Sequence, residues 1–92
     1  MRAKWGQRAA KKLQLRLEQL GAADCLADMS RLPGARCHQL TGDRAEILSV
    51  DLVHPYRLLF VVANEPAPRK PDGGLDWSQI TEIEILSIED TH

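Results

Sequence analysis

The sequence has few of the residues that cross-link a fold or bind metals. Its 92 residues include two cysteines, Cys25 and Cys37, and neither lies in a Cys-x-x-Cys or His-rich pattern. Two thiols are too few for a disulfide framework, and no metal-ligand spacing is present. We therefore expect free thiols in a reducing compartment, with no metal and no cofactor.

Long apolar runs are also missing. No stretch of the sequence approaches the roughly 18 apolar residues that a membrane span requires. The N-terminal stretch is cationic but lacks the apolar segment of a signal peptide. We expect a cytoplasmic protein with no membrane partner.

The length excludes separate cofactor and substrate domains, because 92 residues make about one domain, here expected to span 1–92. Hydrophobic residues make up 43% and charged residues 27%, the balance of a folded domain rather than of a disordered chain. A domain of this size has a modest core, so extension of that core by a partner subunit is an open alternative.

Charge is unevenly distributed, although the net charge is −1. Residues 1–46 hold nine cations and five anions, net +4, whereas residues 47–92 hold three cations and eight anions, net −5. This asymmetry indicates either contact with a polyanion on the basic side or merely two solvated faces of opposite sign.

Apolar periodicity predicts two helices at the N-terminal end. The first spans residues 4–20 and ends at Gly21 in a left-handed cap. The second, shorter helix is capped by Asp24, points Leu26 and Met29 inward, and stops at Leu32. The apolar positions of the first helix are Ala9, Ala10, Leu13, Leu17 and Leu20.

Four later segments predict β-strands joined mostly by short turns, which favours antiparallel pairing. The class is therefore α+β, with an N-terminal helical hairpin packed on a small antiparallel sheet. Residues 58–63 are apolar on both strand faces. The second face is then a ligand groove, a surface buried by another chain, or a face that a curled sheet covers by itself. The predicted strands are 36–40, 45–52, 56–63 and 80–88.

Cations recur every four residues along the first predicted helix. Like charges at this spacing cost a few tenths of a kcal/mol per pair. Phosphates of a nucleic acid would compensate this cost, and a solvated polar face is the alternative interpretation. The stripe consists of Lys4, Arg8, Lys12 and Arg16, with Lys11 beside it.

Three histidines are present, and composition alone assigns a site to none of them. His54 precedes Pro55 in a predicted turn, which favours a structural role. His38 lies in the first predicted strand, and His92 is the last residue of the sequence.

Four sequence blocks change this interpretation, because their order and spacing match those of a known family over nearly the whole chain. They are Lys-Lys-Leu-Gln-Leu-Arg-Leu at 11–17, Leu-Pro-Gly-Ala-Arg-Cys-His-Gln-Leu-Thr-Gly-Asp-Arg at 32–44, His-Pro-Tyr-Arg-Leu-Leu-Phe at 54–60, and Glu-Asp-Thr-His at 89–92. Together they resemble HigB-type toxins, the plasmid-maintenance killer proteins of the RelE/ParE superfamily.

The resemblance implies an endonuclease that cleaves mRNA on the ribosome without a metal and is neutralised by a helix-turn-helix, HigA-like antitoxin. RNA supplies its own nucleophile, the 2′-hydroxyl, so the enzyme needs a base, an acid and a cation. We expect His38 as the base, His92 as the acid with Asp90 beside it, and Arg57 as the cation that holds the phosphate. Further RNA contacts are expected from the stripe and from Arg36 and Arg44.

The chain also departs from the family pattern. Thr41 and Thr91 stand where the family usually has Lys and Tyr. The sequence also begins almost on the first predicted helix, where related chains usually have an extra strand, so either the start is displaced or the sheet has lost this strand. These departures favour the alternatives, a gyrase-poisoning toxin or a degenerate toxin that only binds its antitoxin. The missing strand predicts an open sheet edge, self-association or pairing with a partner segment, and marginal stability of the isolated chain.

Overall fold

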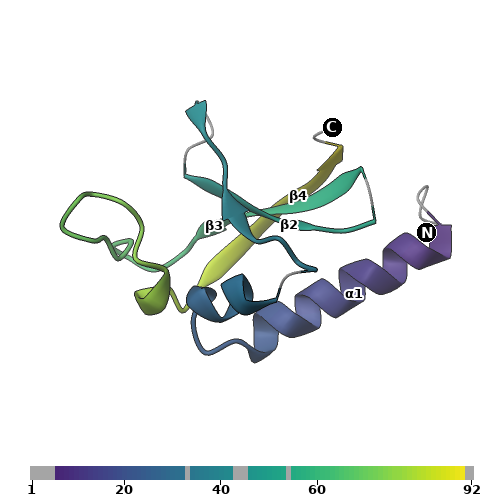
Figure 1. The fold of residues 1–92 in the computed structure, drawn as a ribbon, viewed down its shortest axis with the longest axis horizontal. Helices are drawn as coiled ribbons and strands as arrows, with labels where there is room; N and C mark the ends of the chain where they lie inside the picture. The colour runs from purple at the N-terminus through teal and green to yellow at the C-terminus, as the bar shows by residue number, and fades with distance from the viewer. Residues whose placement is uncertain (1–5, 33, 43–45, 54, 91–92) are drawn as a thin grey trace.

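A computed structural model describes residues 6–32, 34–42, 46–53 and 55–90 (Figure 1). The predicted α+β class is confirmed, because an N-terminal helix and a 3-10 turn precede a four-stranded antiparallel sheet in this part of the chain. The elements are α1 (Gly6–Ala22), η1 (Leu26–Arg31), β1 (His38–Gln39), β2 (Ile47–Asp51), β3 (Tyr56–Val62), η3 (Trp77–Gln79) and β4 (Ile83–Asp90).

The strands lie in sequence order, β1-β2-β3-β4, and each pairs antiparallel with the next. A bulge interrupts β4, because Phe60 pairs with Ile85 and Leu59 pairs with Ser87, which leaves Leu86 as the extra residue. An extra residue shifts the alternation of side chains between the two faces. The residues of β4 after Leu86 therefore face the side opposite to the one that simple alternation from Ile83 would give them.

The core lies between the sheet and the helical layer. Figure 1 shows α1 running along one side of the sheet. Leu13 and Leu20 of α1 and Leu26 and Met29 of η1 pack against the buried residues of one sheet face. These buried sheet residues are Leu48, Val50, Leu58 and Phe60. Within the described residues, no helix is both long enough and apolar enough to cross a bilayer.

The face of α1 that packs on the sheet differs from the predicted one. Leu17 is 43% exposed, whereas Arg16 is 4% exposed. The inward stripe is therefore Leu13, Arg16 and Leu20, spaced by three and four residues as a helix requires. Gly21 lies inside α1 rather than in a left-handed cap, because glycine also adopts helical angles and the following Ala22 is a strong helix former.

The second predicted helix is a 3-10 helix, and Cys25 rather than Asp24 occupies its N-cap. Leu26 and Met29 are buried, as predicted. Their spacing of three residues stacks them on one side of a 3-10 helix, which has three residues per turn. A six-residue segment is also short for an independent α-helix, so packing against the core decides its form.

The second face of the sheet is also covered at its centre. Leu59 is 1% exposed and Ser49 is 0% exposed, although they alternate with the residues of the helix-covered face. This burial occurs within the single chain, so of the three alternatives it favours a sheet that covers the middle of this face by itself. Leu58, Leu59 and Phe60 are all buried, so the prediction that β3 is covered on both faces is confirmed for these three residues.

Burial makes Cys37 an unreactive thiol. The half-buried Cys37 packs against the core, and burial raises the pKa of its thiol to about 12 from an ordinary value of 9.0. At pH 8 we expect iodoacetamide to modify Cys37 roughly 10³-fold more slowly in the folded protein than in urea, because the thiolate is the reactive form. Mass mapping of the labelled peptide checks this result, and equal rates in both states would contradict it.

The same shift predicts a loss of stability in alkali. The unfolded chain loses the Cys37 proton first, so this contribution is complete below pH 9 and declines as the pH rises toward 12. Between these values we expect the free energy of unfolding to fall by about 1.4 kcal/mol per pH unit relative to Cys37→Ala. Urea titrations of both proteins at pH 8 and pH 10 measure this difference, and parallel behaviour would contradict it.

Candidate functional site

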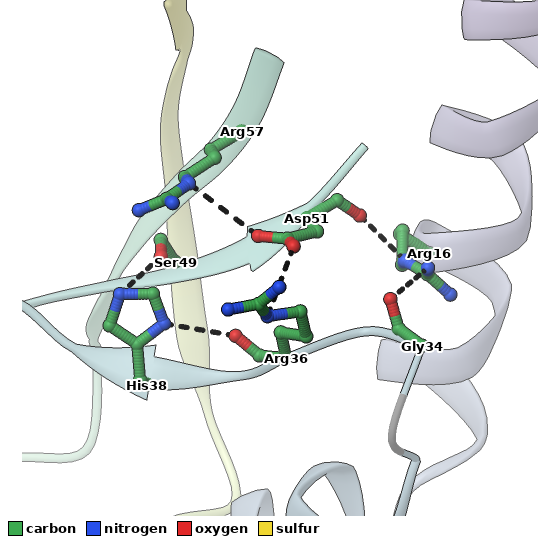
Figure 2. Close-up of polar contacts among 7 residues, drawn as sticks. All are labelled: Arg16, Gly34, Arg36, His38, Ser49, Asp51 and Arg57. Carbon is green, nitrogen blue, oxygen red and sulfur yellow. Dashed lines mark hydrogen bonds and ion pairs between the residues drawn. The ribbon is translucent and has the colours of Figure 1, made fainter. Parts of the chain in front are cut away.

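Polar side chains gather on the sheet face opposite α1. His38 of β1 pairs with Ser49 of β2, and Asp51 of β2 pairs with Arg57 of β3. Side chains of directly paired residues lie on the same face of a sheet, and residues i and i+2 of one strand share a face. All four residues therefore share the face that the helices leave open, and Figure 2 shows them together.

The hydrogen bonds of His38 define its tautomer. Its Nδ1 lies 3.0 Å from the carbonyl oxygen of Arg36. A carbonyl oxygen only accepts, so Nδ1 carries the proton and Nε2 is the basic nitrogen of the neutral ring. Nε2 lies 3.5 Å from Ser49 Oγ, and His38 is exposed to solvent. The exposed ring thus presents a basic nitrogen beside a buried hydroxyl.

An unusual backbone conformation accompanies this contact. Arg36 has a φ of 47°, in the left-handed region that non-glycine residues rarely adopt. Such a conformation costs on the order of 1 kcal/mol and is often found at functional sites. Here the strained residue is the one whose carbonyl accepts from His38.

Asp51 lies between two arginines on the same face (Figure 2). Its Oδ2 is 3.5 Å from Arg36 Nε, and its Oδ1 is 3.5 Å from Arg57 Nε. Oδ1 is buried and has no hydrogen bond of good geometry, so its contact with Arg57 is mainly electrostatic. The side chains of Arg36 and Arg57 are 73% and 33% exposed, so both remain accessible to an anion.

Arg16 supports this site from behind. Its Nε donates to the main-chain carbonyl of Asp51 at 2.7 Å, Nη2 donates to the carbonyl of Gly34 at 2.7 Å, and Nη1 donates to Gln19 Oε1 at 2.9 Å. Burial lowers the pKa of Arg16, and the charge of Asp51 opposes this shift. The prediction that Arg16 lies on an exposed cationic stripe is wrong, because its guanidinium joins α1 to β2 and to the segment before β1.

The other predicted basic residues are only partly described. Lys12 is half-exposed on α1, and Arg8 lies in α1. The remaining predicted site residues, Lys4, Arg44 and His92, lie outside the described residues, as does His54.

The strand register separates the two carboxylates at the end of β4. Asp90 pairs with Tyr56, on the face that the helices cover, whereas Glu89 pairs with Arg57. Ser87, on the same face as Glu89, donates its hydroxyl to Glu89 Oε2 at 3.1 Å. The register thus brings Glu89, rather than the predicted Asp90, to the face that carries His38 and Arg57.

Sequence reasoning missed Ser49 and Asp51 as site residues. One signal was available, because these two polar residues occupy alternate positions in a strand that is otherwise largely apolar. Alternation of this kind predicts a polar stripe on one face. Within the described ranges, no cluster of three or more His, Cys, Asp or Glu side chains is arranged to hold a metal ion.

Comparisons with protein-family models, with curated proteins and with solved structures gave no match for this chain.

Neutralisation of Asp51 provides a test of the anion-binding character of this face. In Asp51→Asn, we expect the affinity for single-stranded RNA to rise by roughly an order of magnitude at 50 mM salt. The slope of log affinity against log salt should steepen by about 0.7 to 1.4, because Arg36 and Arg57 become free to release counterions. Fluorescence anisotropy of a labelled oligoribonucleotide measures both quantities.

Asp28→Asn is the matched control, because Asp28 pairs with Arg31 on η1, away from this face. It should leave the affinity and the slope unchanged. If both variants behave like the wild type, the face does not contact phosphates.

Proposed function

We propose that this chain is a toxin of a type II toxin–antitoxin system, of the RelE/ParE kind, which cleaves ribosome-bound mRNA without a metal. The observation that carries the proposal is the placement of His38 and Arg57, which come from different strands, on one accessible face of the sheet. The sequence resemblance to HigB-type toxins supports the choice of reaction and target.

In the proposed reaction, Nε2 of His38 takes the proton from an RNA 2′-hydroxyl. The 2′-oxygen forms a bond to phosphorus, the bond from phosphorus to the 5′-oxygen breaks, and the products are a 2′,3′-cyclic phosphate and a 5′-hydroxyl. Arg57 stabilises the charge that develops on the phosphate oxygens. His92, assigned from the sequence, gives its proton to the departing 5′-oxygen.

Substrate binding requires an exchange of partners at Asp51. A phosphate that approaches Arg36 and Arg57 competes with this carboxylate, and both ion pairs have a length of 3.5 Å, so the exchange breaks no short hydrogen bond. Partly exposed ion pairs contribute about 1 kcal/mol or less. Asp51 therefore holds the two guanidinium groups on this face until RNA arrives.

The same ion pairs favour a second candidate, a toxin-like protein that binds an antitoxin or another protein without cleaving RNA. Asp51 partly neutralises both arginines, which reduces the positive potential that attracts RNA. In this alternative His38 and Arg57 are structural residues of a binding face.

Controlled expression in bacteria tests the proposal against this alternative. We expect growth arrest, relief by a helix-turn-helix antitoxin, and cellular mRNA fragments that begin with a 5′-hydroxyl within coding regions. Growth arrest with intact mRNA and gyrase-linked DNA breaks would contradict the proposal and show a gyrase-poisoning toxin. Antitoxin binding without growth arrest would replace it with the binding-only type.

A further inference from the structure

A depression lies beside the outer strand β1, on the side opposite to His38. It has a volume of about 430 Å³ and is lined by Gln39 of β1 together with Lys70, Gly74, Asp76 and Trp77. Gln39 pairs with the core residue Leu48, whereas the adjacent His38 pairs with Ser49 on the open face. The depression and the candidate site thus lie on the two sides of the same two-residue strand.

The wall of the depression is a preformed turn rather than a loose loop. The backbone N–H of Lys70 donates to the carbonyl of Gly74 at 2.7 Å, and the N–H of Gly73 donates to the carbonyl of Lys70 at 2.9 Å. Gly73 has a φ of 91°, which strongly favours glycine. Leu75 is 5% exposed and fixes the turn to the core.

A second contact holds this turn against the sheet. Arg69 donates through Nη2 to Glu46 Oε1 at 2.7 Å and through Nη1 to the carbonyl of Gly73 at 3.1 Å. Figure 1 shows the β3–β4 loop (green) projecting from one end of the sheet, with η3 at its base. Because binding sites are usually preformed concave surfaces, this anchored depression is a suitable place for a small planar group.

We propose that the depression holds one unpaired purine base of a single-stranded RNA, next to the nucleotide at His38. This inference rests on the proposed function for the identity of the ligand. The half-buried Trp77 packs against the core and also lines the depression, so it offers a fixed indole surface for base stacking. Stacking of a base on an aromatic side chain contributes about 1–3 kcal/mol and does not depend on phosphate charge.

The polar groups of the lining favour a base over a phosphate. Asp76 Oδ1 accepts from the backbone N–H of Ser78 at 3.1 Å and from its hydroxyl at 2.6 Å, which fixes the carboxylate beside Trp77. A carboxylate repels a phosphate but accepts from the N–H donors on a base edge. Lys70 lies 4.0 Å from Asp72, so its charge is partly balanced by a nearby carboxylate.

The position of the depression suits a strand of RNA that passes over β1. Residues 38 and 39 are neighbours, with Cα atoms about 3.8 Å apart, and their side chains face opposite sides. One nucleotide can therefore present its 2′-hydroxyl to His38 while the base of the next enters the depression. Stacking at this point would fix the register of the RNA and favour a purine beside the cleaved bond.

The fluorescence of Trp77 measures binding of a base in the depression. The chain has two tryptophans, so Trp5→Phe leaves Trp77 as the single tryptophan. In this background we expect saturable quenching of its fluorescence by a short purine-rich oligoribonucleotide and by GMP and AMP, with weaker quenching by CMP and UMP. Ribose 5-phosphate should give no quenching, and the quenching by GMP should change little between 50 and 200 mM salt.

Substitution of Trp77 then separates stacking from folding. Trp77→Leu keeps an apolar side chain against the core, and Trp77→Phe keeps a smaller aromatic ring. We expect Trp77→Leu to lower oligoribonucleotide affinity by about 5- to 100-fold, the size of one lost stacking contact, and Trp77→Phe to lower it less. Anisotropy of a labelled RNA measures both, with thermal unfolding to check that each variant folds.

The outcomes distinguish this inference from the proposed function. If RNA quenches Trp77 but is never cleaved, the base-binding site is supported and the proposed nuclease activity is contradicted. Cleavage that depends on His38, together with no quenching and wild-type affinity in Trp77→Leu, would overturn the base site and keep the nuclease. Equal quenching by ribose 5-phosphate and GMP would show a phosphate site and overturn the inference.

Discussion

Arg16→Ala is expected to destabilise the fold by about 2–4 kcal/mol, because it removes a charged donor from three hydrogen bonds. Two of the acceptors are main-chain carbonyls, at Gly34 and Asp51, that belong to different segments of the chain. Loss of these hydrogen bonds leaves two partly buried carbonyl oxygens without the Arg16 donor and opens space between α1 and β2. For a chain of this size, each kcal/mol lowers the melting temperature by roughly 4–8 °C.

Thermal unfolding followed by circular dichroism measures this effect. Arg16→Lys should recover only part of the loss, because an ammonium group does not match the fork geometry of a guanidinium. Arg31→Ala is the matched control, since Arg31 is 78% exposed in its ion pair with Asp28 and should change stability by about 0.5 kcal/mol or less. A melting temperature that is the same in Arg16→Ala and Arg31→Ala would contradict the structural role of Arg16.

The second large effect is expected on catalysis. His38→Ala should lower the single-turnover rate of mRNA cleavage on ribosomes by about 10²- to 10⁴-fold, since it removes the general base. Arg57→Ala should lower it by about 10²- to 10³-fold, since it removes the main stabiliser of the phosphate charge. Arg57→Lys should retain part of this activity, because it keeps the charge but not the planar fork.

Full cleavage activity in both alanine variants, with unchanged folding, would remove this face from the reaction.

The sequence predicted the elements of this fold better than their contacts. The apolar period of α1 and the short apolar segments bounded by turn-forming residues at β2 and β3 are local signals, and both led to the right elements. The burial of Arg16 has no local signal, because its carbonyl partners lie 18 and 35 residues away. A cation spaced by four from other cations therefore resembled a solvated stripe, although it faces the core.

The candidate site was predictable only in part, for a similar reason. His38 and Arg57 came from sequence blocks, but their common face follows from the register with Ser49 and Asp51. Asp90 was chosen over Glu89 from the resemblance to HigB-type toxins, whose C-terminal pattern has an Asp close to the last His. The bulge at Leu86 brings Glu89 to the open face instead, and nothing in the local sequence reveals a bulge.

The β3–β4 loop shows a further limit of the prediction. Its proline and glycine residues indicated a connector, and Leu75 was not recognised as a core residue. Ile80 was predicted to begin the last strand, whereas it lies before β4 and is buried in the core. Single apolar side chains in a turn-rich segment are a weak signal of anchoring. The depression that this loop forms with β1 depends on that anchoring.

The central claim is that the RNA 2′-hydroxyl is the nucleophile of a cleavage performed on this sheet face. The most direct measurement uses purified ribosomes with two mRNAs, one carrying a single 2′-deoxynucleotide at the cleaved position and the other carrying it one position away. We expect cleavage of the first to be lost and cleavage of the second to continue, with a 5′-hydroxyl on the product. Cleavage at the deoxynucleotide itself, or a 5′-phosphate on the product, would contradict this account.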